Sequence, residues 1–280
     1  DLLRHFANHG HEVFIVCPYE RRTKRESSLH HINNVHILGV KTLNITKTSI
    51  FEKGLATFLI ERQFGKAINK NFNNYKFDLI LYSTPPIKLN LLIEKLKLKH
   101  QAKTYLMLKD IFPQNAIDLG IIKEGGVLSR YFRKKEQKLY KISDFIGCMS
   151  PANAEYTLKK NIFLDKKKIG ICPNAIEVID RVVVNKQNIL NSYRIPSDTT
   201  VFIYGGNLGV PQGIEFLIEI LEIYKNRIDC FFVIVGNGEK AHLVEKWVRL
   251  NSPINVIYLP ELERNKYEQL EACCDIGMIF

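Results

Sequence analysis

Glycines gather at a point where an apolar strand-like run is followed by a helical pattern. After the run Val201–Tyr204, residues 205–213 read Gly-Gly-Asn-Leu-Gly-Val-Pro-Gln-Gly, and a helix is expected from Ile214. Glycine lets a backbone turn tightly and approach a ligand, while the first turn of a helix offers unpaired N–H groups at the positive end of its dipole. The segment therefore favours binding of a phosphate-like anion, although a tight turn that binds nothing would have the same spacing.

The spacing within this turn excludes two common phosphate-binding motifs. Asn207 stands where the second glycine of G-x-G-x-x-G would fall, so the segment is not a dinucleotide fingerprint. No Gly-Lys-Ser or Gly-Lys-Thr follows, so it is not a P-loop either. Any anion at this turn must be held in another way.

Two further apolar runs in this half of the chain end in turn-forming residues. The run Phe231–Val235 is followed by Gly236-Asn237-Gly238, and the run Val256–Leu259 is followed by Pro260. Ligands in open α/β sheets bind outside the carboxyl ends of the strands. Because three such ends belong to one half, we expect them to line one crevice, which favours a binding site over purely structural turns.

Neither the histidines nor the cysteines indicate a metal site. His30 and His31 are adjacent, so they point apart in an extended chain, and no third ligand stands at metal-binding spacing. The six cysteines include no C-x-x-C pair, and most fall in apolar runs, which is typical of reduced core cysteines. We therefore expect no metal and no disulfide framework.

Apolar strand-like runs alternate with helical patterns along the chain. Phe58, Ile60, Phe64, Ala67 and Ile68 suit one such helix. Strands alternating with helices predict an α/β fold whose parallel sheets are buried on both faces. The expected strands are Val13–Cys17, Val35–Val40, Leu79–Tyr82, Thr104–Leu108, Phe145–Met149, Ile169–Cys172, Val201–Tyr204, Phe231–Val235, Val256–Leu259 and Ile276–Phe280.

Sequence and charge both divide the chain. The turn-forming Pro173-Asn174-Ala175 follows a strand-like run, so we expect domains over 1–174 and 175–280. Residues 1–180 carry a formal charge of +13 and the remainder −2, which gives the total of +11. A basic half is compatible with nucleic acid, anionic lipid or a phosphorylated acceptor, and equally with solvated surface lysines.

Both ends of the sequence read as interrupted elements. Leu2, Leu3 and Phe6 form an apolar helix face directly at the start, and Ile276–Phe280 reads as an unfinished buried strand. We expect a fragment that lacks at least one N-terminal strand and a C-terminal portion. No stretch approaches 18 consecutive apolar residues, so no transmembrane helix is expected, and no signal peptide is recognised.

In their order and spacing these motifs resemble glycosyltransferase family 4, the retaining enzymes with the GT-B fold, and within it the branch that builds bacterial capsule and O-antigen polysaccharides. The similarity is collinear over essentially all 280 residues. Besides the three turns, it is carried by His9-Gly10-His11-Glu12-Val13, Lys109-Asp110-Ile111-Phe112-Pro113-Gln114 with Leu119-Gly120, Met149-Ser150, Cys172-Pro173-Asn174-Ala175-Ile176-Glu177 and Cys274-Asp275-Ile276.

The resemblance implies two Rossmann-like domains that face each other across a cleft, both incomplete here. The first would bind the acceptor and the second a nucleotide sugar, expected to be a UDP-sugar, with no further cofactor. The family's E-x7-E motif would begin shortly after Phe280, and its N-terminal glycine-rich loop would precede Asp1. The implied donor-site residues are Gly205, Gly206, Asn207, Leu208, Gly209, Gln212, Gly236, Asn237, Gly238, Leu259 and Pro260.

The donor loop departs from the family in its charge. Asn207 and Gln212 stand roughly where many members place Arg and Lys. Neutral donors make weaker hydrogen bonds to phosphate than charged ones do. Either the backbone and the helix dipole contribute more here, or another residue supplies the charge.

Asp110 is the candidate catalytic residue of the first domain, because it follows the run Thr104–Leu108 at the expected carboxyl edge of the sheet. Its carboxylate could orient the acceptor hydroxyl or stabilise an oxocarbenium-like charge. A helix cap or an ion pair with Lys109 is the structural alternative, and both interpretations remain open.

The resemblance also implies an acceptor that is a free or a polyprenyl-diphosphate-linked saccharide, and hence a cytoplasmic enzyme at the inner face of the plasma membrane. Tyr131–Lys141 and Ile50–Phe72 mix aromatic and basic residues. This mixture is compatible with peripheral contact to anionic lipid and also with ordinary amphipathic surface helices.

Two other functions are compatible with parts of the sequence. A nucleotide-sugar 2-epimerase has the same architecture, and an E-x7-E motif would favour the transferase over it. A basic nucleic-acid-binding module would show a helix-turn-helix, zinc or aromatic-sheet motif, and none is recognised. The glycine turns would also be unexplained, so we expect no nucleic-acid partner.

Overall fold

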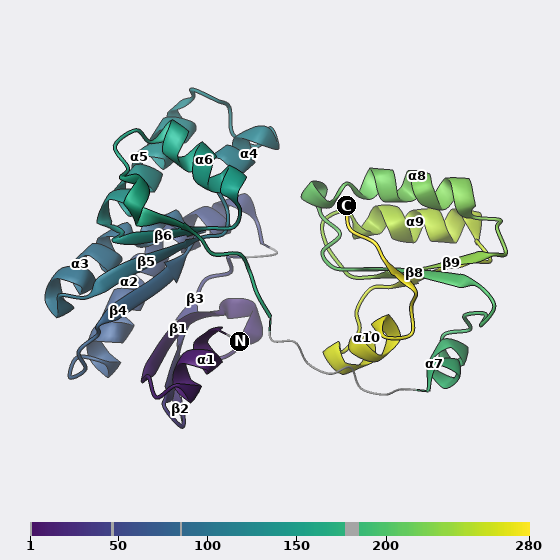
Figure 1. Cartoon of the computed structure of the whole chain (residues 1–280), viewed down its shortest axis with the longest axis horizontal. Coiled ribbons are helices and arrows are strands. Elements are labelled where there is room, and N and C mark those ends of the chain that lie inside the picture. Colours follow the sequence, from purple (N-terminus) through teal and green to yellow (C-terminus); the bar gives the residue numbers. More distant parts are fainter. Residues whose placement is uncertain (1, 46–47, 85, 177–184) are drawn as a thin grey trace. The chain divides into compact units, whose positions relative to one another are not determined.

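The computed structural model describes residues 2–45, 48–84, 86–176 and 185–280, and the chain divides into two compact units over 1–177 and 178–280 (Figure 1). The sequence places this boundary between 174 and 175. Glu177, which ends the motif at 172–177, lies outside the described residues. Each unit combines helices with parallel strands, and each is described by itself.

The first unit contains a parallel sheet of order β4-β5-β6-β7 and a smaller sheet of order β1-β3-β2. In the smaller sheet β1 runs parallel to β3, while β2 is antiparallel to β3. The sequence analysis missed β2, because its residues are mostly polar or exposed and backbone pairing with β3 places them. The strands are β1 (Val13–Glu20), β2 (Ser28–Ile32), β3 (Val35–Thr42), β4 (Leu79–Ser83), β5 (Lys103–Leu108), β6 (Phe145–Cys148) and β7 (Ile169–Ile171).

Helices cover these sheets with apolar side chains at helical spacing. In α2, Ile60, Phe64 and Ile68 are buried in a cluster with Leu38 of β3. Phe58 is 69% exposed, because two residues before Ile60 a helix has turned to nearly the opposite side. The helices are α1 (Leu2–Asn8), α2 (Ile50–Asn71), α3 (Asn90–His100), α4 (Gln114–Asp118), α5 (Val127–Ile142) and α6 (Pro151–Lys160), with short 3-10 turns at Arg21–Thr23, Ile87–Leu89 and Lys166–Lys168.

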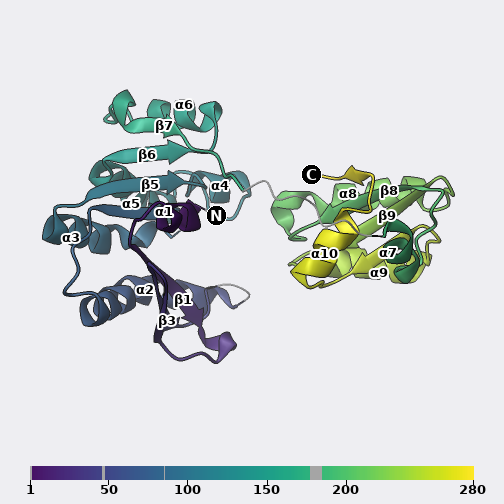
Figure 2. The same cartoon turned by 60° about the horizontal axis from the view of Figure 1, so that its bottom comes forward.

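The second unit is built on one sheet of order β10-β9-β8-β11, and every pairing in it is parallel. Figure 2 shows this unit with its helices around the strands. All residues of β9 are buried, because helices cover both faces of the sheet. Its elements are α7 (Lys186–Ser192), β8 (Thr200–Gly205), the 3-10 turn Val210–Gln212, α8 (Ile214–Tyr224), β9 (Cys230–Val235), α9 (Ala241–Asn251), β10 (Val256–Leu259), α10 (Arg264–Glu271) and β11 (Ile276–Gly277).

Two hydrophobic clusters flank this sheet. On one face Phe232 and Ile234 of β9 pack with α8 and α9, and on the other Val233 packs with α7 and α10. The strand expected over Ile276–Phe280 is formed only at Ile276–Gly277, and both of those residues are exposed. None of the described helices is both long and apolar enough to cross a membrane.

Candidate functional site

The carboxyl ends of β8, β9 and β10 lie at one edge of the second sheet. Parallel pairing aligns Gly205 with Val235 and Val235 with Leu259. The turns that follow these strands are therefore neighbours, as the sequence analysis expected. The N–H of Gly206 donates to the carbonyl of Val235 at 3.0 Å, and that of Gly236 donates to the carbonyl of Leu259 at 3.0 Å.

The first two turns touch through their backbones. The N–H of Leu208 donates to the carbonyl of Asn237 at 3.0 Å. A Cβ added to Gly236, where φ is +148°, would lie 1.8 Å from the carbonyl oxygen of Gly206. One added to Gly238 would lie 2.5 Å from the carbonyl oxygen of Leu208. Packing between the turns therefore accounts for these two glycines without any ligand.

Gly206 has no such packing reason. The nearest heavy atom to a Cβ added there would be the Tyr204 hydroxyl oxygen at 3.7 Å, which is ordinary contact, and its φ is not in the left-handed region. The residue is exposed at the strand end that leads to α8. The surrounding protein would thus accept a side chain here, and the glycine leaves the backbone open to close approach.

The neutral amides of the loop interact with each other. The Nδ2 of Asn207 donates to the Oε1 of Gln212 at 3.0 Å, on the side of the loop where a Cβ of Gly209 would point. The backbone carbonyl of Asn207 accepts from the Tyr204 hydroxyl at 2.8 Å. Within the described ranges, no acceptor is recorded for the backbone N–H of Asn207 or Gly209. These N–H groups can therefore donate to an anion.

Two of the expected donor-site residues offer only their backbone. The side chain of Leu208 is completely buried in the cluster beneath α8 and α9. Leu259 packs against the cluster on the opposite face of the sheet. Both residues support the turns, since their main-chain groups hold neighbouring turns together.

A cation that the sequence analysis missed lies beside the loop. The backbone N–H of Lys240, just before α9, donates to the carbonyl of Leu208 at 2.8 Å. Its Nζ is 2.7 Å from a carboxylate oxygen of Glu215 in the first turn of α8. The hydrogen bond from this ammonium lowers the pKa of Glu215, and the same bond raises the pKa of Lys240. No local pattern points to Lys240, because it follows the second turn in sequence and reaches the first turn through space.

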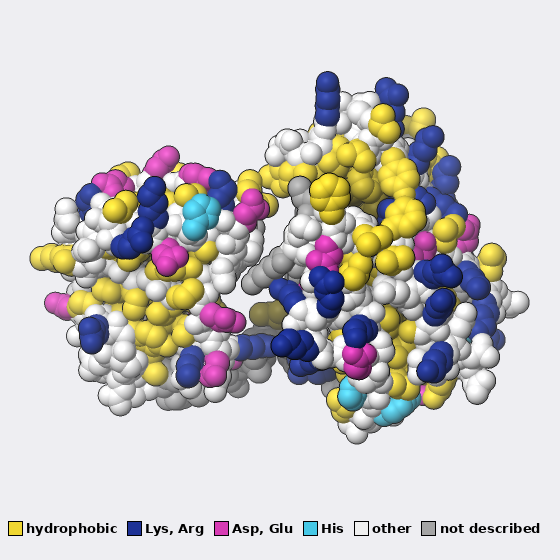
Figure 3. Space-filling model, turned by 180° about the vertical axis from the view of Figure 1, so that it is seen from behind, with side chains coloured by type: hydrophobic (Ala, Val, Ile, Leu, Met, Phe, Trp, Pro, Cys, Tyr) yellow, Lys and Arg dark blue, Asp and Glu magenta, His cyan; other side chains and the backbone are white. Residues whose placement is uncertain are grey.

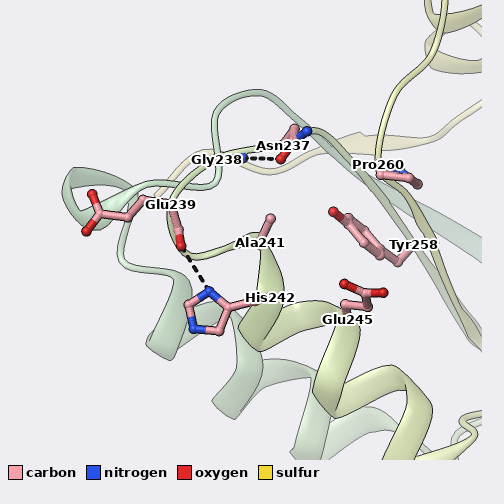
Figure 4. A pocket seen from close by; sticks show the side chains of 8 residues that line it. All are labelled: Asn237, Gly238, Glu239, Ala241, His242, Glu245, Tyr258 and Pro260. Carbon is pink, nitrogen blue, oxygen red and sulfur yellow. Dashed lines mark hydrogen bonds between the residues drawn. The ribbon is translucent and has the colours of Figure 1, made fainter. Parts of the chain in front are cut away.

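A pocket of about 680 Å³ opens between the second turn and the start of α9 (Figure 4). The side chains of Glu245 and Tyr258 point into it, whereas Glu239 points away. The Tyr258 hydroxyl donates to the carbonyl of Gly236 at 3.1 Å, and burial raises its pKa. The lining residues are Asn237, Gly238, Glu239, Ala241, His242, Glu245, Tyr258 and Pro260.

The chemistry of this pocket differs from that of the loop. A carboxylate beside a phenol repels phosphate and accepts hydrogen bonds, which suits the N–H groups of a base or the hydroxyls of a sugar. The turn residues Asn237, Gly238 and Pro260 were expected here. Glu245 and Tyr258 were missed, because they lie inside a helix and a strand rather than in a turn.

Asp110 lies in the first unit, just beyond the carboxyl end of β5, with an exposed side chain. Its backbone carbonyl accepts from the Thr84 hydroxyl at 2.9 Å. The N-cap of α4 is Pro113, so Asp110 does not cap that helix. Over the described parts of the chain, no ion pair between its carboxylate and Lys109 is recorded. The carboxylate is therefore accessible for chemistry at this edge.

Among the described residues, no group of three or more His, Cys, Asp or Glu side chains is arranged to hold a metal ion. His31 pairs with His36 across strands β2 and β3, and the Nδ1 atoms of the two rings are 2.6 Å apart. His36 contacts Glu12 at 2.8 Å through its other ring nitrogen. These contacts form a hydrogen-bonded chain of side chains on the smaller sheet.

No protein-family model matches the chain. It is similar to one curated protein, the probable glycosyltransferase WbjE of Pseudomonas aeruginosa, with 23% identity over 235 residues. The alignment covers 83% of this chain and 57% of WbjE. The chain thus spans little more than half the length of that relative.

Solved structures with the same arrangement of elements include three with 12–13% identity. Sucrose-phosphate synthase from Thermosynechococcus elongatus has a TM-score of 0.70, over 99% of this chain and 67% of that one. WaaG, a glycosyltransferase involved in lipopolysaccharide biosynthesis, has 0.63, over 99% and 69%. Anabaena HepE in complex with UDP-glucose has 0.57, over 86% and 59%. These similarities confirm the GT-B fold, with two Rossmann-like units.

Proposed function

We propose that this chain is the greater part of a family 4 glycosyltransferase. It binds a nucleotide sugar, a UDP-sugar, on the second unit and transfers the sugar with retention of configuration to a saccharide or lipid-linked saccharide on the first. The product is a cell-surface polysaccharide, made at the inner face of the plasma membrane. The observation that carries this proposal is the exposed backbone at Gly206, where the absence of a side chain leaves room for a ligand beside the loop.

The edge of the second sheet offers different chemical groups to the diphosphate and to the nucleoside of a nucleotide sugar. The diphosphate lies against Gly206, Asn207 and Gly209, where backbone N–H groups and the start of α8 favour an anion. Lys240 supplies the positive charge that the loop itself lacks, by turning from Glu215 to phosphate. The pocket with Glu245 accepts hydrogen bonds from the nucleoside.

The comparisons support the same assignment. WbjE is named as a probable glycosyltransferase, and HepE has the same fold with UDP-glucose bound. WaaG shares the fold and is involved in lipopolysaccharide biosynthesis, which supports a role in cell-surface polysaccharide. The motifs that resemble family 4 fall at the strand ends of these units.

Calorimetric titration with UDP tests the donor site. We expect the chain to bind UDP, and Gly206→Ala to weaken binding about tenfold or more, because the added methyl group separates phosphate from the backbone. The matched control is Gly170→Ala in β7, where an added Cβ would meet nothing within 4 Å. It should bind UDP as the unaltered chain does.

Two results would contradict the proposal. The first is that UDP gives no heat of binding with the unaltered chain at millimolar concentration. The second is that Gly206→Ala binds UDP as tightly as Gly170→Ala does. Thermal melts of both variants should match that of the parent, since neither glycine is needed by its surroundings.

We also propose that the first unit touches the membrane. Phe51 and Phe58 of α2 are 92% and 69% exposed. The Lys88 ammonium lies 4.0 Å from the ring centroid of Phe58 and 5.5 Å from that of Tyr131 in α5. Apolar side chains lie among lysines and arginines on the right-hand body of Figure 3, which is the first unit. This combination suits the interface of an anionic bilayer.

A further inference from the structure

A second pocket lies in the first unit, between α4 and the beginning of α5. Its volume is about 480 Å³, and α5 contributes most of its lining. Positively charged side chains dominate it, with a single carboxylate among them. The charged and polar lining residues are Glu124, Ser129, Arg130, Arg133, Lys134 and Gln137.

Two of these cations form no ion pair with any described residue. Arg130 and Lys134 are exposed and four residues apart, so they lie on the same face of α5. No ion pair of either is recorded anywhere in the described parts of the chain. Like charges at this spacing destabilise a helix, and an anion bound between them would remove the repulsion.

Arg133 forms the wall behind them. Its guanidinium lies 3.1 Å from a carboxylate oxygen of the buried Glu136 and also donates to Gln114 of α4. Burial opposes its charge, but the contact with Glu136 outweighs this effect, so the pKa of Arg133 is raised. These contacts join α4 to α5 and give the pocket a fixed shape.

The start of α5 adds to the positive potential. This 16-residue helix begins at Val127 with no acidic residue in its first turn and no side-chain cap from Gly126. The Ser129 hydroxyl donates to the carbonyl of Gly126 at 2.9 Å, so the first N–H groups remain available. The dipole of the helix and the cations of its second turn therefore favour the same ligand.

We propose that this pocket binds a phosphate group. Arginine and lysine side chains near a helix start match the charge and shape of phosphate oxygens. Val127 and Leu128 beside it are 84% and 61% exposed, which suits a phosphate that carries a hydrocarbon chain. We assign this phosphate to the acceptor, and this assignment rests on the proposed function. Asp110, the proposed catalytic residue, lies in the segment that leads into α4 beside the pocket.

Titration with inorganic pyrophosphate, in the presence of saturating UDP to occupy the donor site, tests this proposal. The double variant Arg130→Gln with Lys134→Gln should weaken pyrophosphate binding about tenfold or more. The matched control is Lys66→Gln with Lys70→Gln, which removes the same charge at the same spacing from exposed positions of α2. It should change binding less than twofold.

The proposal is overturned if the unaltered chain does not bind pyrophosphate, or if both double variants weaken binding equally. UDP affinity measured separately on each variant distinguishes this failure from failure of the donor site. Phosphatidylglycerol vesicles then separate two sources of phosphate. Vesicles that displace pyrophosphate assign the pocket to a lipid headgroup, and vesicles that leave it bound assign the pocket to a phosphorylated acceptor.

Discussion

The glycines at one edge of the second sheet are not equally required by packing. A side chain at Gly236 would collide with the backbone of Gly206, so the fold requires this glycine. A side chain at Gly206 would meet no atom closer than 3.7 Å, so packing does not require this glycine, and we propose that its open backbone binds the donor phosphate. A sequence motif does not distinguish the two glycines. Substitution of Gly236 should disturb folding, whereas substitution of Gly206 should disturb binding.

The positive charge beside the glycine loop likewise comes from a residue that the sequence did not point to. Asn207 and Gln212 leave the loop neutral, and Lys240 approaches it from the next helix. Its ammonium is paired with Glu215. In the proposed donor site, phosphate would compete with an exposed carboxylate for this lysine, and such an exposed pair is weak enough to exchange.

Asp110→Asn tests the role of the first unit at the scale of a residue. Because the carboxylate is exposed and caps no helix, we expect an unchanged melting temperature and unchanged UDP binding. Transfer from a UDP-sugar should fall about a hundredfold, as expected for loss of a general base or of charge stabilisation. Radiolabelled sugar incorporated into a bacterial lipid and saccharide extract measures it.

For this experiment Asp118→Asn is the control, since it removes a carboxylate from the end of the neighbouring α4. Equal transfer by Asp110→Asn and the parent chain would refute the catalytic assignment. A loss shared by both variants would point to the surface charge instead.

At the scale of elements, both units contain an aspartate just before a strand that binds a neighbouring strand and a lysine of a helix. Asp275 precedes β11, and its carboxylate accepts from the backbone N–H of Val201 in β8 at 2.9 Å and from Lys186 of α7 at 2.8 Å. The bonds from Lys186 and Val201 lower the pKa of Asp275. An aspartate that resembled part of a family motif thus has a structural task, which is to fix where β11 begins.

The first unit uses Asp144 in the same way. It precedes β6, accepts from the backbone N–H of Thr104 in β5 at 2.9 Å, and pairs with Lys97 of α3 at 2.9 Å. Burial opposes its charge, but the bonds from Lys97 and Thr104 outweigh burial and lower its pKa. In both units a short aspartate therefore joins neighbouring strands to a helix.

Asp275→Ala should destabilise the second unit by about 1 kcal/mol at pH 7, because the Val201 N–H loses its acceptor at a partly exposed site. The lowered pKa means that this stabilisation is present above the usual value of 3.8 and is lost as pH falls through the folded-state value. The difference between variant and parent should therefore shrink at pH 3. Trp247, the single tryptophan, reports urea unfolding of this unit.

The control variant Asp275→Asn keeps an oxygen for the Val201 N–H and lacks the charge. It should cost less stability than alanine, and its own stability should not vary with this titration. If Asp275→Ala and the parent differ equally at pH 3 and pH 7, the ionised carboxylate is not what stabilises β11.

At the scale of the whole molecule, the charge difference between the halves of the sequence is a difference between the two units. The basic half forms the first unit, where the exposed ring of Phe58 in α2 lies beside Lys88 and cations of α5 line a pocket. The second unit presents the glycine edge and an acidic pocket. We propose on these grounds that the first unit contacts anionic surfaces and phosphates and that the second binds a nucleotide.

Phe51→Ser with Phe58→Ser should lower binding to vesicles containing phosphatidylglycerol about tenfold or more, because two exposed rings no longer enter the interface. Sedimentation with vesicles measures it, and binding should weaken with salt, since lysines contribute. Leu98→Ser with Ile162→Ser, at positions 74% and 94% exposed elsewhere in this unit, is the control. Vesicle binding that both double variants retain would exclude α2 as the contact.

The sequence by itself determined the α/β class, the positions of most strands and the glycine turns, although the observed strands end up to three residues from the expected ends. These follow from local patterns, since periodicity, apolar runs and glycine act over a few neighbouring residues. Strand β2 escaped this reasoning, because its polar residues are placed by pairing with β3.

Only the tertiary structure decided which residues meet. Lys240 reaches the glycine loop, Tyr258 and Glu245 share a pocket, and Arg130 and Lys134 lie in another with Arg133. It also showed that Gly236 is required by packing and Gly206 is not. The physical reason is that contact and burial depend on distances between segments remote in sequence, which no local pattern contains.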